Sequence, residues 1–303
     1  MPRTEWLTST LANVHTCYGH RLDRKRFRMA LLTAYFDESG LSPDEQYCVV
    51  AGFIGNDAQW AAFAADWIPA IKPRQNLHMR KLRWNSQRDR IASLLAKLGP
   101  LPHKYNLTPI AVSMKWSDYE THLKGKIPSQ YAGHPYITCA QSCIAATLLE
   151  VIKDDEIYFV FDRQEGLRKE LMDELRDIVF GFIGADRRVK GMDFIDHSET
   201  VCLDPADYFA YITRELAVDE SSFAARAGVS IIGDRIHGGR IGPHQMDLIV
   251  NSWSAKTAEE VYVDLQKSPF FRGPVVTSEF VERTAERLKR RDAKKKRESE
   301  PGV

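Results

Sequence analysis

The chain has little that would tie it to a membrane or to an oxidising compartment. It lacks a run of roughly 20 apolar residues, the length that a helix needs to span a bilayer. The segment 1–28 lacks the continuous apolar core of a secretory signal. The cysteines number only five, none of them in a CxxC pair, and an odd count argues against a complete disulfide framework. These absences predict no membrane span, reduced cysteines and a cytoplasmic location.

Signatures of several enzyme classes are absent as well. No Gly-Lys-Ser/Thr sequence closes a phosphate-binding loop, and no GxSxG or Cys/His motif marks a nucleophile. The two histidines of segment 237–244 have no Cys or acidic partner at zinc-binding spacing. We therefore interpret the Gly-rich segment 228–243 as an exposed loop, whose functional role would be to close over a substrate.

What the chain does contain is enough apolar residue for one substantial core, since 44% of its 303 residues are hydrophobic. The net charge is only +1, but basic residues gather at 21–28, 80–83 and 283–297. Such runs bind phosphates without reading a base sequence. A solvated helical tail explains the terminal run equally well.

Hydrophobic periodicity predicts an α/β protein. Apolar runs predict strands at 34–37, 47–54, 107–115, 157–162 and 192–195, and amphipathic periods predict helices at 57–71, 85–98, 137–152, 167–182 and from 204 onward. The two kinds of element do not alternate strictly, which indicates a mixed sheet flanked by helices. The predicted organisation is a polar leader (1–30), a core domain (31–217), a Gly-containing irregular extension (218–277) and a basic C-terminal helix or tail (278–303).

Acidic residues follow the predicted buried strands. Asp37 and Glu38 come at the end of the first strand, Asp162 ends the strand at 157–162, and Asp204 and Asp207 open the next helix. Carboxylates this close to buried structure are costly unless they are paired, hydrogen-bonded or metal-bound. Converging carboxylates hold the Mg²⁺ or Mn²⁺ ions of two-metal phosphodiester hydrolysis. The spacing therefore predicts a metal site.

Each acid also has a structural explanation. Asp37 would cap the turn that follows it, and Asp162 the segment after its strand. Asp204 precedes Pro205, an arrangement typical of a helix N-cap, so capping is the favoured role for Asp204. Asp207 lies one turn further into the helix, where capping explains it poorly, and it is the better ligand.

Four motifs carry a family resemblance: YFDESG at 35–40, FVFD at 159–162, IDHS at 195–198 and ADYFAY at 206–211. With them the chain resembles, over about residues 32–217, the domain-of-unknown-function 3800 family. The pair Leu77-His78 and the segment 112–115 also fall where that family has a His-containing segment and a strand. The family's usual Leu-Gln-x-Ala-Asp reads Leu-Asp-Pro-Ala-Asp at 203–207, which adds an acid and loses the Gln.

The resemblance implies an RNase H-like fold and a presumed nuclease activity in a phage-defence or mobile-element context. Carried over residue by residue, it implies that Asp37, Asp162 and Asp207 hold the metals, with Glu38 as a further catalytic member. The predicted function is a nuclease that hydrolyses phosphodiester bonds of DNA or RNA with Mg²⁺ or Mn²⁺ held in a two-metal site. Whether the protein also has an activator or another protein partner stays open.

Several residues are predicted to contact the nucleic acid. His78, Arg80 and Lys81 form one group, in which His78 would serve as a general base or an outer-shell group, or else as a structural histidine. Four aromatic residues lie near basic ones, where an aromatic ring can stack on single-stranded bases, although core packing is the favoured role for most of them: Trp84, Trp116, Tyr119 and Tyr131. Two other functions stay open, a non-catalytic nucleic-acid- or protein-binding module of the same fold, and a phosphotransfer enzyme of another α/β fold with Asp37 as nucleophile.

Overall fold

The computed structural model describes most of the predicted core and part of the predicted extension. The described residues are 31–74, 76–82, 84, 86–127, 133–151, 155–163, 175, 188–232 and 236–254. The predicted leader 1–30, nearly all of the predicted helix 167–182, Tyr131 and the basic tail 278–303 lie outside them. Within the described ranges, no helix has the length and apolarity needed to cross a bilayer.

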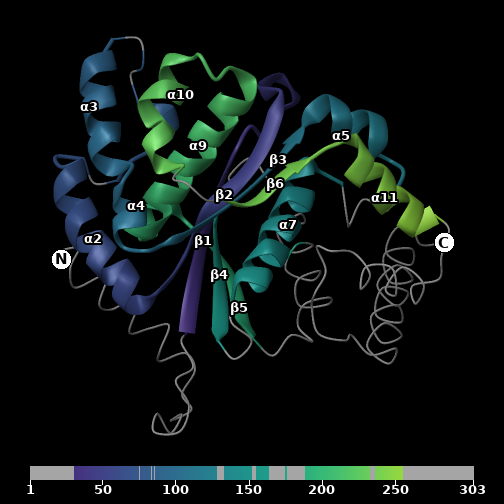
Figure 1. Cartoon of the computed structure of the whole chain (residues 1–303), viewed down its shortest axis with the longest axis horizontal. Helices are drawn as coiled ribbons and strands as arrows, with labels where there is room; N and C mark the ends of the chain where they lie inside the picture. The colour runs from purple at the N-terminus through teal and green to yellow at the C-terminus, as the bar shows by residue number, and fades with distance from the viewer. Residues whose placement is uncertain are drawn as a thin grey trace, which may run out of the picture.

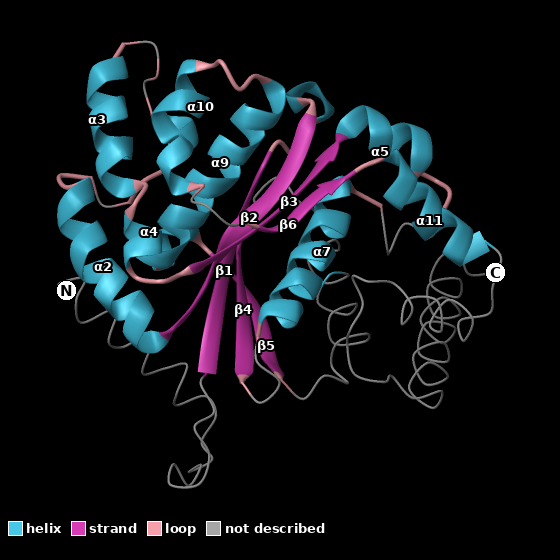
Figure 2. Ribbon diagram, in the orientation of Figure 1, coloured by secondary structure: helices cyan, strands magenta, loops and turns pink. Residues whose placement is uncertain are grey.

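The described residues form one six-stranded mixed sheet (Figure 2). Its strands are β1 (Leu31–Ser39), β2 (Tyr47–Asn56), β3 (Thr108–Lys115), β4 (Glu156–Asp162), β5 (Val189–Ile195) and β6 (His237–Ile241). They lie in the order β5-β4-β1-β2-β3-β6. Strand β2 is antiparallel to both β1 and β3, whereas the pairs β1/β4, β4/β5 and β3/β6 are parallel. The predicted α/β class with a mixed sheet is confirmed.

Helices cover both faces of this sheet (Figure 1). One face, here called the α9 face, carries α2 (Asp57–Ile71), α3 (Arg88–Leu98), α4 (Leu101–Lys104), α9 (Asp204–Val218) and α10 (Phe223–Gly228). The other, the α7 face, carries α5 (Trp116–His122), α7 (Pro135–Glu150) and α11 (Pro243–Ser254). Short 3-10 turns η1 (Pro43–Glu45), η2 (Met79–Lys81), η4 (His197–Glu199), η5 (Val201–Leu203) and η6 (Val229–Ile231) join these elements.

Helix α2 confirms the prediction made from hydrophobic periodicity. Its buried residues are the ones that the spacing predicts: Trp60, Phe63, Ala64, Trp67 and Ile71. A capping box between Asn56 and Gln59 fixes its start, because each side chain satisfies a backbone N–H of the other residue. Pro69 lies inside the last turn, and the helix ends at Ile71.

Alternation along β1 and β4 sends neighbouring side chains to opposite faces. Phe36 and Phe161 stack on each other on the α7 face, with ring centroids 5.2 Å apart. The next residue of each strand, Asp37 and Asp162, therefore turns to the α9 face. A strand pair that is apolar on one face thus presents two carboxylates on the other.

Two strands differ from the prediction. Strand β1 continues to Ser39, so Asp37 lies inside the strand and does not cap a turn. The segment predicted as an exposed loop contains β6, which pairs with β3. Its glycines explain the wrong prediction: Gly238 has φ of 111°, and a Cβ there would lie 2.2 Å from the Ala111 carbonyl oxygen, so close pairing excludes side chains.

The region after residue 217 also holds more structure than its irregular pattern predicts, since α10 and α11 lie there. Trp116 and Tyr119 are 7% and 3% exposed and pack in the core of the α7 face. Core packing, the role favoured for most of the predicted aromatic residues, is therefore confirmed for these two, and neither offers a ring for stacking on a base.

Candidate metal centre

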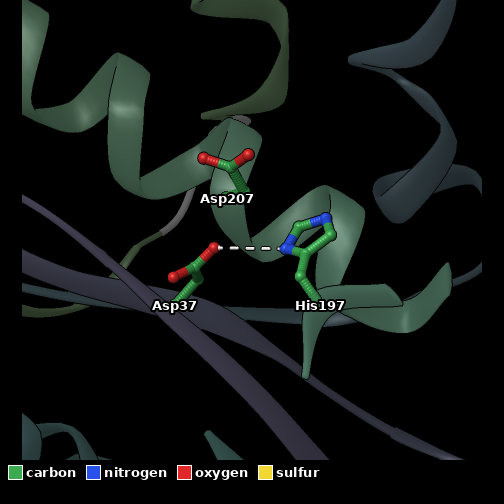
Figure 3. Close-up of side chains that lie close together, drawn as sticks. All are labelled: Asp37, His197 and Asp207. Atoms are coloured by element: carbon green, nitrogen blue, oxygen red, sulfur yellow. Dashed lines mark ion pairs between the residues drawn. The ribbon is translucent and has the colours of Figure 1, made fainter. Parts of the chain in front are cut away.

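Three segments that are far apart in the sequence bring potential metal ligands together. Asp37 comes from β1, His197 from η4 and Asp207 from the first turn of α9. One ligand atom of each residue lies within 4.8 Å of the ligand atoms of the other two, and all three side chains are buried. Figure 3 shows the three side chains converging, with the Nδ1 atom of His197 facing Asp37.

Asp162 joins this cluster through the sheet. The parallel β1/β4 register pairs Phe36 with Phe161, so Asp37 and Asp162 follow side by side. The Nδ1 atom of His197 lies 3.7 Å from an Oδ2 oxygen of each. The structure therefore brings the three predicted ligands, Asp37, Asp162 and Asp207, around one imidazole.

His197 is held by its other ring nitrogen. Its Nε2 atom lies 3.0 Å from the Leu77 carbonyl oxygen and 3.1 Å from Oδ1 of Asp204. Because both partners are acceptors, Nε2 carries a proton and donates it to them. Nδ1 is buried and has no hydrogen-bond partner among the described residues. A capping box between Asp196 and Glu199 fixes the turn that carries this histidine.

Asp204 supports the histidine and does not cap the helix. The N-cap of α9 is Leu203, and Asp204 is the first helical residue, fully buried. Its Oδ2 atom accepts hydrogen bonds from Trp67 Nε1 at 2.9 Å and from the Leu77 N–H at 3.0 Å. The favoured capping role was wrong because the carboxylate faces partners from the α2 helix and the segment after it, which no local pattern reveals.

Asp207 connects the cluster to the surface. Its Oδ2 atom accepts the Met79 N–H and lies 2.9 Å from Nδ1 of His78, whose side chain is 31% exposed. The rings of His78 and His197 stack with centroids 4.9 Å apart. Arg80 and Lys81 lie in the same 3-10 turn as Met79 and are exposed. The predicted group of His78, Arg80 and Lys81 is thus placed beside the cluster.

Burial controls the protonation of the cluster. Burial raises the pKa of Asp37 to about 7; His197 opposes this rise, and the charges of Asp207 and Asp162 add to it. Burial alone would lower the pKa of His197, but Asp162, Asp204 and Asp37 raise it well above its ordinary value. The carboxylates exceed the positive charge available to them, which is the condition that a bound cation relieves.

Glu38, the predicted fourth member, does not belong to the group of mutually close ligands. Glu38 follows Asp37 on β1, and because successive side chains of a strand point to opposite faces, its side chain turns toward the α7 face. Burial, followed by the charge of Asp37, raises the pKa of Glu38 well above its ordinary value. Its Oε2 atom is buried without a hydrogen-bond partner among the described residues.

Sequence reasoning missed one residue of this cluster, His197. The histidine lies in one of the four motifs of the family resemblance, but its spacing to Asp37 and Asp162 carries no periodic signal. Neither a scan against models of protein families nor a search of curated proteins found a match to this chain. The resemblance to the domain-of-unknown-function 3800 family stays a prediction.

Proposed function

We propose that the chain is a metal-dependent nuclease that hydrolyses phosphodiester bonds of DNA or RNA with Mg²⁺ or Mn²⁺. The observation that carries this proposal is the buried convergence of Asp37, His197 and Asp207, with ligand atoms within 4.8 Å of one another. Carboxylate oxygens suit both ions, and an imidazole nitrogen favours Mn²⁺ over Mg²⁺.

The donor set fits a cation for a second reason. Metal-binding histidines in proteins donate their other N–H to a carboxylate or a backbone carbonyl. The Nε2 atom of His197 does so to both Asp204 and Leu77, which leaves Nδ1 toward the carboxylates. A cation held by Asp37, His197 and Asp207 would also offset the surplus of buried negative charge. A second ion, as in a two-metal scheme, would draw on Asp162, which lies beside Asp37 on the same face of the sheet.

A bound divalent ion would supply an activated water and stabilise the charge that develops on the scissile phosphate. The chain's own residues would divide the remaining work. His78 lies 2.9 Å from Asp207 through its Nδ1 atom and its side chain is 31% exposed, so it would serve as a general base or an outer-shell group at the edge that a substrate reaches. Arg80 and Lys81, exposed one turn away, would hold the phosphate backbone.

We also propose that the strands from β1 to β5 have an RNase H-like topology. The antiparallel β1-β2-β3 meander, with β4 and β5 added in parallel beside β1, supports this assignment. Strand β6 then extends the sheet beyond β3. A fold does not fix an activity, so the proposed function depends on the cluster and not on the topology.

The test combines metal binding with cleavage. Wild type, Asp37→Asn, Asp207→Asn and the matched control Asp44→Asn are titrated with Mn²⁺ and assayed on labelled single- and double-stranded DNA and RNA. Asp44 is an exposed acid in η1, outside the cluster. We expect wild type and Asp44→Asn to bind Mn²⁺ and cut, and both cluster variants to lose cleavage by at least about 100-fold.

Two results would contradict the proposal. One is cleavage that persists in folded Asp37→Asn and Asp207→Asn. The other is the absence of Mn²⁺ binding by the wild-type protein, which would favour the alternative, a non-catalytic nucleic-acid- or protein-binding module. The low exposure of Asp37 and Asp207, 3% and 7%, is the observation that favours this alternative, because a buried network can be purely structural.

A further inference from the structure

A second feature lies beside the metal centre on the α9 face, an aromatic ledge made by Trp84, Tyr211 and Phe223. The rings of Trp84 and Tyr211 are parallel, with centroids 5.4 Å apart and an interplanar angle of 6°. Phe223 meets Trp84 edge to face at 6.3 Å. All three residues are only partly buried.

The ledge is joined directly to the proposed metal ligand Asp207. Tyr211 lies one helical turn after Asp207 on α9, so the two side chains share a face of that helix. Trp84 Nε1 donates to the Met79 carbonyl oxygen at 3.2 Å, and the Met79 N–H donates to Asp207 at 2.9 Å. One short segment thus fixes both the ledge and the acid.

The charge around the ledge matches a polyanion. Segment 80–90 carries five basic residues and a single acid, Asp89. Arg80 and Lys81 are exposed just before Trp84, and exposed Arg88 lies over the Phe223 ring at 5.3 Å from its centroid. A half-exposed aromatic pair among cations is the combination by which proteins bind unpaired bases together with their phosphates.

Arg214 also lies over the Tyr211 ring, 5.3 Å from its centroid, so Tyr211 supports Trp84 from behind. We propose that Trp84, backed by Tyr211, stacks a base of single-stranded nucleic acid, whose backbone lies along Arg80, Lys81 and Arg88 toward the metal centre. This inference rests on the proposed nuclease function and names its substrate class, single strands. Duplex bases are already stacked on one another, so they cannot use the ledge. The interaction recognises a π-face that every base has, and it therefore predicts little base preference.

The experiment measures binding without metal, so that it does not depend on cleavage. Fluorescence anisotropy of a labelled 12-nucleotide oligothymidine and of a blunt 12-base-pair duplex is followed in EDTA. Trp84→Ala should weaken single-strand binding about 5- to 100-fold. Trp84→Phe, which keeps a ring, should stay within about threefold of wild type, as should Tyr105→Ala, a half-buried tyrosine elsewhere on the α9 face. Circular dichroism confirms that each variant is folded.

The outcomes separate this inference from the proposed function. Three results would contradict the proposed role of the ledge. They are equal single-strand affinity of folded Trp84→Ala and wild type, an equal loss of affinity for the duplex, and no single-strand binding by wild type. Cleavage that depends on Asp37 and Asp207 would then still support the nuclease. Conversely, Trp84→Ala could lose single-strand binding while the wild-type protein binds no Mn²⁺. That result would support the ledge and contradict the proposed metal centre.

Discussion

Both faces of the sheet bury an apolar core, but they differ at neighbouring positions of β1 and β4, where one face buries aromatic rings and the other buries carboxylates. On the α7 face, Phe36 and Phe161 pack with cysteines, Ile and Met beneath α7. On the α9 face, one residue further along, Asp37 and Asp162 meet His197 and Asp207. Packing of apolar side chains on the α7 face stabilises the fold, whereas burial of the carboxylate cluster costs folding free energy, which a bound cation would offset under the proposed function.

The largest effect should come from the α7 face. Phe36→Ala would leave a cavity between Phe159 and Phe161, both of which stack against Phe36. We expect the free energy of unfolding to fall by about 3–5 kcal/mol. Chemical denaturation measures this directly. A loss below about 1 kcal/mol would show that the apolar face is not the main source of stability in this part of the sheet.

Asp37→Asn should raise the free energy of unfolding of the metal-free protein, whereas Phe36→Ala lowers it. Because the pKa of Asp37 is raised to about 7 when folded, against an ordinary value of 3.8, its contribution is favourable at low pH and is lost as pH rises through 7. At pH 8 the variant should therefore be more stable than metal-free wild type by roughly 2–4 kcal/mol. Thermal unfolding from pH 4 to pH 8 tests this. Mn²⁺ should raise the melting temperature of wild type only.

Asp204→Asn should destabilise the protein, in contrast to Asp37→Asn in the same cluster. Asp204 accepts hydrogen bonds from Trp67, Leu77 and His197, and an amide cannot accept from all of them in the same way. The expected cost is about 1.5–3 kcal/mol. Mn²⁺ affinity should also fall about 10- to 100-fold, because His197 loses its carboxylate support. Unchanged affinity by calorimetry would remove His197 from the proposed ligand set.

Glu38→Gln should have the smallest effect. Burial raises the pKa of Glu38 well above its ordinary value, which favours the neutral form of the side chain, and Gln is nearly isosteric with that form. We expect a stability change below about 1 kcal/mol. Cleavage assays on the same variant decide whether Glu38 contributes to a second ion. A large loss of cleavage with unchanged stability would restore it to the site.

Much of the architecture was predictable because it depends on local periodicity. The buried stripe of α2, the strands β2 and β4 and the mixed sheet all follow from spacings of two or of three and four residues. Strand β6 was not predicted because a strand is recognised from the alternation of its side chains, and Gly238 and Gly239 have none. The acids Asp37, Asp162 and Asp207 were found because charge next to buried strands is unusual in any sequence.

The sequence by itself determined which acids must be buried and which strands carry them. Only the tertiary structure decided their roles. Asp204 and Asp207 are three residues apart on one helix, but Asp204 is enclosed by Trp67, Leu77 and His197, whereas Asp207 faces the cluster. The place of His197 in the cluster follows only from the tertiary structure, which brings β1, β4 and α9 next to it. A ligand set is defined by distances between segments, and periodicity along a chain does not encode those distances.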